Sequence, residues 1–128
     1  MYNKEPIVLI DNVLELTYVE NRGAAFGILQ NKLVFFYILT IVVFVVIFYY
    51  LYKISLNLHY LPCYIFLILI FSGAVGNFID RIKNKYVIDF IYFKLIDFPV
   101  FNFADICITL GCVLLVFSLI FVYRGEEI

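Results

Sequence analysis

The chain has 128 residues, of which 66% are hydrophobic, 20% are aromatic and only 15% are charged. Soluble domains hold about 25% charged residues, and a chain this short has too little interior to bury so much apolar surface. Nine Lys and Arg stand against ten Asp and Glu, which excludes the basic surface of a nucleic-acid-binding protein. Three cysteines in apolar runs exclude a disulfide framework. The composition therefore predicts an integral membrane protein.

In chain order, the first segment covers residues 1–31 and is too polar to cross a bilayer. Within it Leu14, Leu16 and Tyr18 alternate with Glu15 and Thr17. A period of two is typical of a strand that has one face against a membrane or against protein. We therefore expect residues 1–31 to form a surface segment of β-strand and loop.

Three later segments are long and apolar enough to cross the bilayer as helices, which takes roughly 20 residues. They cover residues 33–52, 61–80 and 103–123, and the connection 81–101 holds four basic residues among many aromatic ones. This connection is expected to lie against the bilayer surface. The predicted fold is a single-domain all-α membrane protein with three transmembrane helices and a small β-containing segment on the membrane surface.

Acidic residues near the ends of these spans are the candidates for chemistry, because ionisable groups at membrane depth are costly and are usually functional. Asp80 ends the second span, Asp105 opens the third, and Asp89 lies between them in an apolar run. Two carboxyl groups that converge in a low-dielectric site share a proton, so that one activates water while the other protonates a carbonyl. Asp89 and Asp105 are the best such pair. The only histidine, His59, lies in the opposite loop, and this chemistry requires no metal and no cofactor.

Each acid also has a structural interpretation, as part of a helix cap or of an ion pair. An Asn three residues before an Asp shares its helix face and can cap the helix or orient the carboxylate. The pairs that stay open are Asn77 with Asp80, Asn102 with Asp105 as a cap, Asp80 with Arg81, Asp89 with Lys83 or Lys85, and Asp97, as a solvated loop acid, with Lys94.

Four short blocks are spread along most of the chain, from residue 19 to residue 105. They are VENRGAAFGIL at 19–29, SGAVGNFIDR at 72–81, VIDF at 87–90 and FPVFNFAD at 98–105. In this order they resemble the motifs of bacterial lipoprotein signal peptidases, also called signal peptidase II, with Ser72 where glycine is usual.

This resemblance implies a membrane aspartyl endopeptidase that removes signal peptides from prolipoproteins, cutting before a diacylglyceryl-modified cysteine. It implies Asp89 and Asp105 as the catalytic dyad, and a multi-pass protein of the bacterial cell membrane with its site near the extracytoplasmic surface. Prolipoproteins and membrane lipid are then the partners, while the oligomeric state stays open. The implied supporting positions are Asn21, Asn77, Asp80, Arg81 and Asn102, and the glycines that a side chain would crowd are Gly23, Gly27, Gly73 and Gly76.

The chain departs from the family at its start. Family members begin with an additional spanning helix that carries an Asp-x-x-Thr-Lys-like motif, and Met1 falls where the segment after that helix starts. Without this helix the basic residues of 1–32 and 81–101 favour a cytoplasmic location for the site. We therefore expect poor activity of the chain as given, and recovery when a preceding span is added. Two alternatives remain, a truncated non-catalytic remnant and a proton-relay component of a membrane carrier, although a relay would place its acids nearer the span midpoints.

Overall fold

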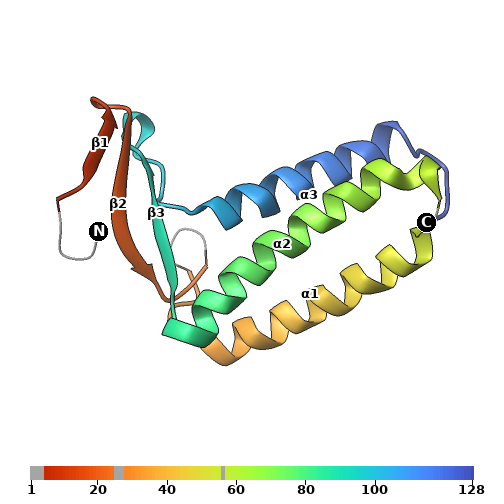
Figure 1. Cartoon of the computed structure of the whole chain (residues 1–128), viewed down its shortest axis with the longest axis horizontal. Coiled ribbons are helices and arrows are strands. Elements are labelled where there is room, and N and C mark those ends of the chain that lie inside the picture. The colour runs from red at the N-terminus through yellow and green to blue at the C-terminus, as the bar shows by residue number, and fades with distance from the viewer. Residues whose placement is uncertain (1–4, 25–27, 56) are drawn as a thin grey trace.

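The computed structural model describes residues 5–24, 28–55 and 57–128. Gly27 and the first four residues of the expected surface segment lie outside the described residues. Figure 1 shows three long helices that run along the molecule, with a small sheet at one end of them. The sheet and the helix ends beside it hold the residues that matter for chemistry.

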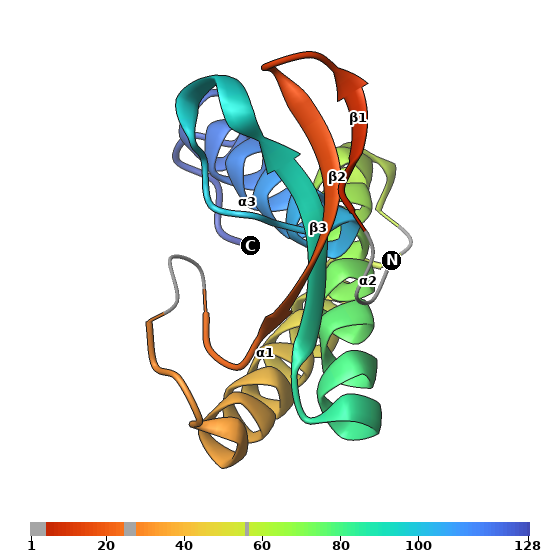
Figure 2. The same cartoon turned by 90° about the vertical axis from the view of Figure 1, so that its left-hand side faces the viewer.

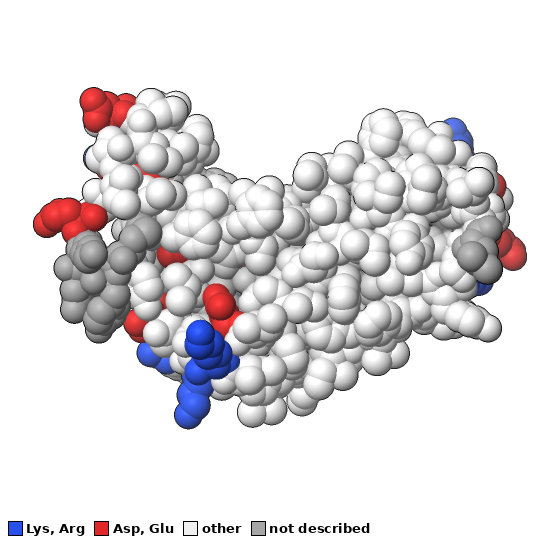
Figure 3. All heavy atoms as spheres, in the orientation of Figure 1, with Lys and Arg blue, Asp and Glu red and all other residues white. Residues whose placement is uncertain are grey.

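The three helices are α1 (Leu33–Ile54), α2 (Leu61–Asn84) and α3 (Phe103–Phe121), and each is long and apolar enough to cross a membrane. In Figure 3 the charged side chains gather toward the two ends of the visible face, and the middle is uncharged. Uncharged helix surface of this length is suited to lipid. The protein is thus a multi-pass membrane protein with a small sheet, which confirms the predicted fold class.

The helix ends differ from the expected boundaries by a few residues. α1 continues to Ile54 and α2 to Asn84, beyond the expected ends at 52 and 80, whereas α3 stops at Phe121. Two basic residues in the last turn of α2 face its unpaired carbonyl groups favourably. Lys85 then ends the helix in the left-handed conformation, with φ 68°. Residues 81–84 therefore belong to α2 and not to the surface connection.

The sheet has three antiparallel strands in the order β1 (Ile7–Ile10), β2 (Leu14–Asn21) and β3 (Val87–Phe93). β2 confirms the strand that the alternation predicts. β3 is not predicted, because its apolar run lacks that alternation. Its pairing with β2 joins the first segment of the chain to the connection between α2 and α3.

The sheet lies across the ends of α2 and α3, with its strands running across the helix axes (Figures 1 and 2). After β3 the chain passes through a short 3-10 helix, η3 (Lys94–Ile96), and returns to the sheet at Phe101. The backbone N–H of Phe101 donates to the carbonyl of Ile91 at 3.0 Å, and the N–H of Ile91 donates back at 2.7 Å. This bridge places the start of α3 beside β3.

Close packing of α2 on α3 depends on glycine. A Cβ on Gly73 would lie 2.6 Å from Cγ1 of Ile108, and a Cβ on Gly111 would lie 2.7 Å from Cγ1 of Ile70. Small residues let the helix backbones approach each other in a membrane. Gly76 does not show the expected crowding, because its Cβ would meet only the Cβ of an alanine at 3.4 Å. The glycine requirement is therefore strong at Gly73 and weak at Gly76.

The opposite end of the molecule is held by a cluster of buried side chains. Tyr123 is 3% exposed, packs with buried Cys63 and Leu67, and donates its hydroxyl to the carbonyl of His59 at 2.7 Å. The ring of His59 pairs with Glu126 at 2.8 Å. Figure 1 places this end far from the sheet, so His59 is remote from the acids of interest.

Candidate active site

Asp89 lies in the middle of β3, and only 3% of the residue is exposed. Two amide groups donate to its carboxylate, Nδ2 of Asn21 to Oδ2 at 3.1 Å and Nδ2 of Asn102 to Oδ1 at 3.0 Å. The salt bridges of the described residues include no partner of Asp89, so the ion pair considered with Lys83 or Lys85 is wrong. Because neutral amides hold this carboxyl group and no lysine pairs with it in the described residues, it stays available for proton transfer.

Asp105 stands in the first turn of α3, where a capping box forms. The backbone N–H of Asp105 donates to Oδ1 of Asn102 at 2.9 Å, and the N–H of Asn102 donates to Oδ2 of Asp105 at 3.1 Å. The cap that the spacing predicts is therefore confirmed. Oδ1 of Asp105 also accepts from Nδ2 of Asn77 at 3.2 Å, so Asn77 reaches across to α3 and does not hold Asp80.

Two asparagines connect the acids through an unbroken set of hydrogen bonds. Nδ2 of Asn102 donates to Oδ1 of Asn77 at 3.0 Å as well as to Asp89, and Asn77 in turn donates to Asp105. Asn102 and Asn77 are 4% and 8% exposed. Rotating either amide would leave buried polar atoms unpaired, which costs about 1–3 kcal/mol for each group. The network therefore fixes both carboxyl groups in place.

Burial raises the pKa of Asp89 to about 6, from an ordinary value of 3.8. The bond from Asn21 lowers this pKa, the negative charge of Asp105 raises it, and the bond from Asn102 and the charge of Arg81 lower it. The folded state thus keeps a proton that the unfolded chain loses between about pH 4 and pH 6. Folding stability falls as pH rises through this window, by about 3 kcal/mol in all.

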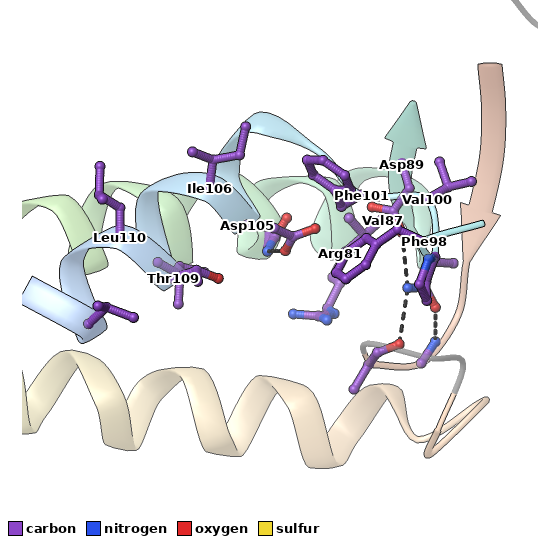
Figure 4. Close-up of a pocket in the computed structure, with 17 residues that line it drawn as sticks. Arg81, Val87, Asp89, Phe98, Val100, Phe101, Asp105, Ile106, Thr109 and Leu110 are labelled. Atoms are coloured by element: carbon purple, nitrogen blue, oxygen red, sulfur yellow. Dashed lines mark hydrogen bonds between the residues drawn. The ribbon is translucent and has the colours of Figure 1, made fainter. Parts of the chain in front are cut away.

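Arg81 stands at the end of α2, beside the two acids. Its guanidinium lies 4.4 Å from the centroid of the Phe36 ring, a cation–π contact with α1, and Figure 4 shows it directed toward that helix. Tyr37 of α1 donates its hydroxyl to the carbonyl of Arg81 at 2.9 Å. These contacts hold a positive charge near the carboxyl groups.

The expected Asp80–Arg81 ion pair is wrong. It is not among the salt bridges of the described residues, and Oδ2 of Asp80 accepts instead from the backbone N–H of Ile88 at 3.1 Å. Asp80 therefore fixes the start of β3 against the end of α2. It positions the strand that carries Asp89 without facing the cavity.

Asp97 is exposed, as expected of a solvated loop acid, but its expected partner is wrong. It accepts from the hydroxyl of Tyr92, whereas Lys94 pairs with Glu15 at 3.3 Å. Asp97 does not line the cavity at Asp89 and Asp105. Asp97 therefore lies between Asp89 and Asp105 in the sequence, but it is not part of the cavity that they line.

A cavity of about 700 Å³ opens at the two acids, within the range of about 300–1,000 Å³ typical of ligand sites. Figure 4 shows Asp105, Ile106, Thr109 and Leu110 following one another along α3. Sequence reasoning missed this apolar wall, although the spacing from Ile106 to Val113 is that of one helix face. The other lining residues that it missed are Gly23 as a wall residue, Ala24, Val87, Phe98, Pro99, Val100, Phe101 and Ile108.

Within the described residues, the polar side chains that line this cavity are two carboxyl groups, two amides, one guanidinium and the hydroxyl of Thr109. No group of three or more His, Cys, Asp or Glu in that part of the chain is placed to hold a metal ion. Two linked carboxyl groups, one with a raised pKa, can exchange protons with water and with a carbonyl oxygen.

Comparison with known proteins agrees with this geometry. A family model described as signal peptidase (SPase) II matches residues 1–121. The lipoprotein signal peptidase of Clostridium tetani (strain Massachusetts / E88) is 45% identical over 119 residues, covering 91% of this chain and 75% of that protein. The protein of the same name from Caldanaerobacter subterraneus subsp. tengcongensis is 48% identical over 114 residues, covering 88% and 75%.

Two solved structures, both described as bacterial membrane enzymes determined by the in meso method, have the same fold. One, at 2.3 Å resolution, has a TM-score of 0.84 and 35% identity, covering 97% of this chain and 77% of that chain. The other, at 1.9 Å resolution, has a TM-score of 0.79 and 38% identity, covering 91% and 76%. The match along 121 of 128 residues, the identities and the shared fold show that this chain belongs to the signal peptidase II family.

Proposed function

We propose that this protein is an aspartyl endopeptidase of the bacterial cell membrane that removes signal peptides from prolipoproteins, cutting before the diacylglyceryl-modified cysteine. The curated relatives carry the name lipoprotein signal peptidase, which supports the substrate class. The observation that carries the aspartyl mechanism is the hydrogen-bonded connection between Asp89 and Asp105 at one cavity.

In the proposed mechanism Asp89 begins protonated and Asp105 begins ionised. The pKa of about 6 favours a proton on Asp89, and Asp105 accepts two N–H bonds in the first turn of α3, where the helix dipole favours negative charge. Asp105 takes a proton from water as the water oxygen attacks the scissile carbonyl carbon. Asp89 gives its proton to the carbonyl oxygen, and a tetrahedral diol forms.

The second half of the reaction restores both acids. Asp105 gives the proton that it took to the leaving nitrogen, and Asp89 takes a proton from one hydroxyl of the diol. The carbon–nitrogen bond then breaks, which releases a carboxylic acid on the signal peptide and a free amine on the cysteine. One water and one peptide bond are consumed, and the two carboxyl groups end in their starting protonation states.

The shape of the cavity suits a substrate held partly in lipid. Beyond Asp105, its wall along α3 is made by Ile106, Ile108, Thr109, Leu110 and Val113, of which only Thr109 is polar, and α3 is long and apolar enough to cross the membrane. Acyl chains and an apolar signal segment gain by burial against such a wall. Asp89 and Asp105 lie at the sheet end of the helices, so we place the cut at the membrane surface. We propose the extracytoplasmic side from the family resemblance alone.

A cleavage assay in lipid vesicles tests this function. The chain, alone and with a spanning helix fused before Met1, is mixed with one prolipoprotein in diacylglyceryl-modified and unmodified forms. We expect cleavage of the modified precursor before its cysteine, at least about tenfold slower cleavage of the unmodified one, and no loss of activity in a chelator. Absence of cleavage in both formats would support the non-catalytic alternative, and activity that depends on a metal would contradict the mechanism.

A further inference from the structure

A second cavity meets the first one at Asp89. It has a volume of about 360 Å³, and it shares with the first cavity the residues Asn21, Asp89, Pro99 and Val100. Its remaining lining comes from β2 and from Gln30. Asp89 therefore lines both cavities, and the proposed mechanism uses only the larger one.

The side chains that shape the second cavity can be assigned from the strand register. Val19 pairs directly with Asp89, so both side chains lie on the same face of the sheet, and Val19 is 38% exposed. Glu20 is next along β2 and points to the other face, where its carboxylate accepts from Tyr18 and Arg22. Three residues line the second cavity and not the first, namely Val19, Glu20 and Gln30. Because the side chain of Glu20 points to the other face, Val19 and Gln30 supply the side chains that bound this cavity.

Gln30 is held beside Asn21 by a hydrogen bond. Its Nε2 donates to Oδ1 of Asn21 at 3.4 Å, and the other end of that amide donates to Asp89. A Cβ on Gly23 would lie 2.7 Å from Nε2 of Gln30, so glycine at 23 leaves room for this side chain. Val19 and Gln30 therefore border the same carboxyl group that the mechanism uses.

The two cavities differ in their surroundings. The larger one follows α3 to Val113, within the predicted span, whereas the smaller one lies over the sheet, which is at the end of the helices (Figure 1). A substrate whose scissile bond lies at Asp89 must place chain on both sides of that bond. Its apolar parts fit the α3 side, and the onward polar chain fits the sheet side.

We propose that the smaller cavity binds the residue that follows the lipid-modified cysteine, and that Val19 and Gln30 limit the size of the side chain accepted there. This inference rests on the proposed function, because it assumes that peptide-bond cleavage takes place at Asp89. The cysteine follows the cut bond directly, and the next residue lies one extended residue, about 3.3 Å, further along, so only the cysteine separates it from the bond being cut. Size selection at this position would make some precursors better substrates than others.

The test compares Val19→Phe with Val8→Phe, the same substitution on neighbouring β1. Val8 is 49% exposed and lines neither cavity. Three diacylglyceryl-modified precursors differ only in the residue after the cysteine, which is Gly, Leu or Trp. We expect Val19→Phe to lower kcat/KM at least tenfold for the Trp precursor and less than twofold for the Gly precursor, with Val8→Phe unchanged. Equal losses for all three precursors, or no loss, would overturn the proposal.

A crosslinking measurement keeps the proposal testable if Val19→Phe folds poorly. An Asp105→Asn protein is irradiated with a modified precursor that carries a benzophenone either after the cysteine or four residues before it. The first probe is expected to label β2 or Gln30, and the second to label α3. Labelling of α3 by both probes would overturn the inference while leaving the proposed function intact. Failure of the unsubstituted protein to cleave any precursor would remove the proposed function, and the inference with it.

Discussion

Replacing Asp89 or Asp105 with Asn is expected to lower prolipoprotein cleavage by at least about 100-fold, within the range that general acid–base groups supply. An amide keeps the shape of the carboxyl group and one of its two accepting oxygens, but it cannot exchange the proton that activates water. Initial rates measured in vesicles with one modified precursor check this, and the proteins should insert in normal amounts. A single variant that keeps more than a few per cent of the activity would show that the dyad is wrongly assigned.

The matched control for this pair is Asp97→Asn. Asp97 is exposed, lies outside the cavity and adopts φ 48°, a conformation that Asn tolerates well. The rate at which the Asp97→Asn protein cleaves the modified precursor is expected to stay within about twofold of the rate of the unsubstituted protein. The double variant of Asp89 and Asp105 should lose no more than either single one, because groups that act as a unit give non-additive losses.

Asn102→Asp is the second change with a large expected effect. The substituted carboxylate can still cap α3, but it can no longer donate to Oδ1 of Asp89 or to Oδ1 of Asn77, each 3.0 Å from the original amide nitrogen. It also adds a third acid beside two others, and like charges at this distance repel strongly. We expect cleavage to fall at least about 100-fold, similar to the loss of one well-placed donor in other active sites.

A matched substitution separates this effect from the general cost of replacing Asn with Asp. Asn57 caps the short 3-10 helix η2 (Leu58–Tyr60) with the same side-chain oxygen, in an exposed position at the opposite end of the molecule. Asn57→Asp is expected to change neither cleavage nor thermal stability by a measurable amount. Thermal unfolding can be monitored by the labelling of Cys63, which is buried in the folded protein. The unfolding temperature of Asn102→Asp is expected to be lower than that of the original protein. Full activity of Asn102→Asp would contradict the role given to the amide network.

Much of the architecture is predictable because bilayer thickness imposes a simple length rule. The three apolar runs predict the three helices to within a few residues, and the alternation at Leu14–Tyr18 predicts β2. β3 is not predictable by the same reasoning. Its run from Val87 to Phe93 is apolar on both faces, because one face meets the helix ends and the other is also partly covered. A period of two appears only where one face is in water.

The acidic residues of the candidate site can be predicted from the sequence, but their hydrogen-bond partners cannot. The placement of Asp89 and Asp105 near span ends is visible in the chain, and so is the cap at Asn102. The partner of Asn77 is not, because a residue three positions away on the same helix competes with one on the neighbouring helix, and only packing decides between them. Asp80 shows the same limit, since adjacency to Arg81 in sequence did not produce an ion pair.

The apolar wall of the larger cavity, along α3, could not be predicted for a different reason. α3 is apolar around its whole circumference, so hydrophobicity does not distinguish the face at Ile106 and Val113 from the faces that contact lipid or α2. The contact of Arg81 with Phe36 is also not predictable from the sequence, because a cation–π contact between two helices produces no periodic pattern of residues. Such features follow from the relative rotation of the helices, which glycines at Gly73 and Gly111 set through close approach.

The pH dependence of kcat/KM tests most directly whether Asp89 and Asp105 share one working proton. With the pKa of Asp89 at about 6, the free enzyme loses that proton as pH rises, and both acids become ionised. We expect kcat/KM for one modified precursor to fall about tenfold per pH unit above an apparent pKa near 6, a value that belongs to the coupled pair. The profile of kcat should break at higher pH, because bound substrate excludes water and favours the protonated form. A kcat/KM that stays flat, or rises, between pH 5 and pH 9 would contradict the shared proton.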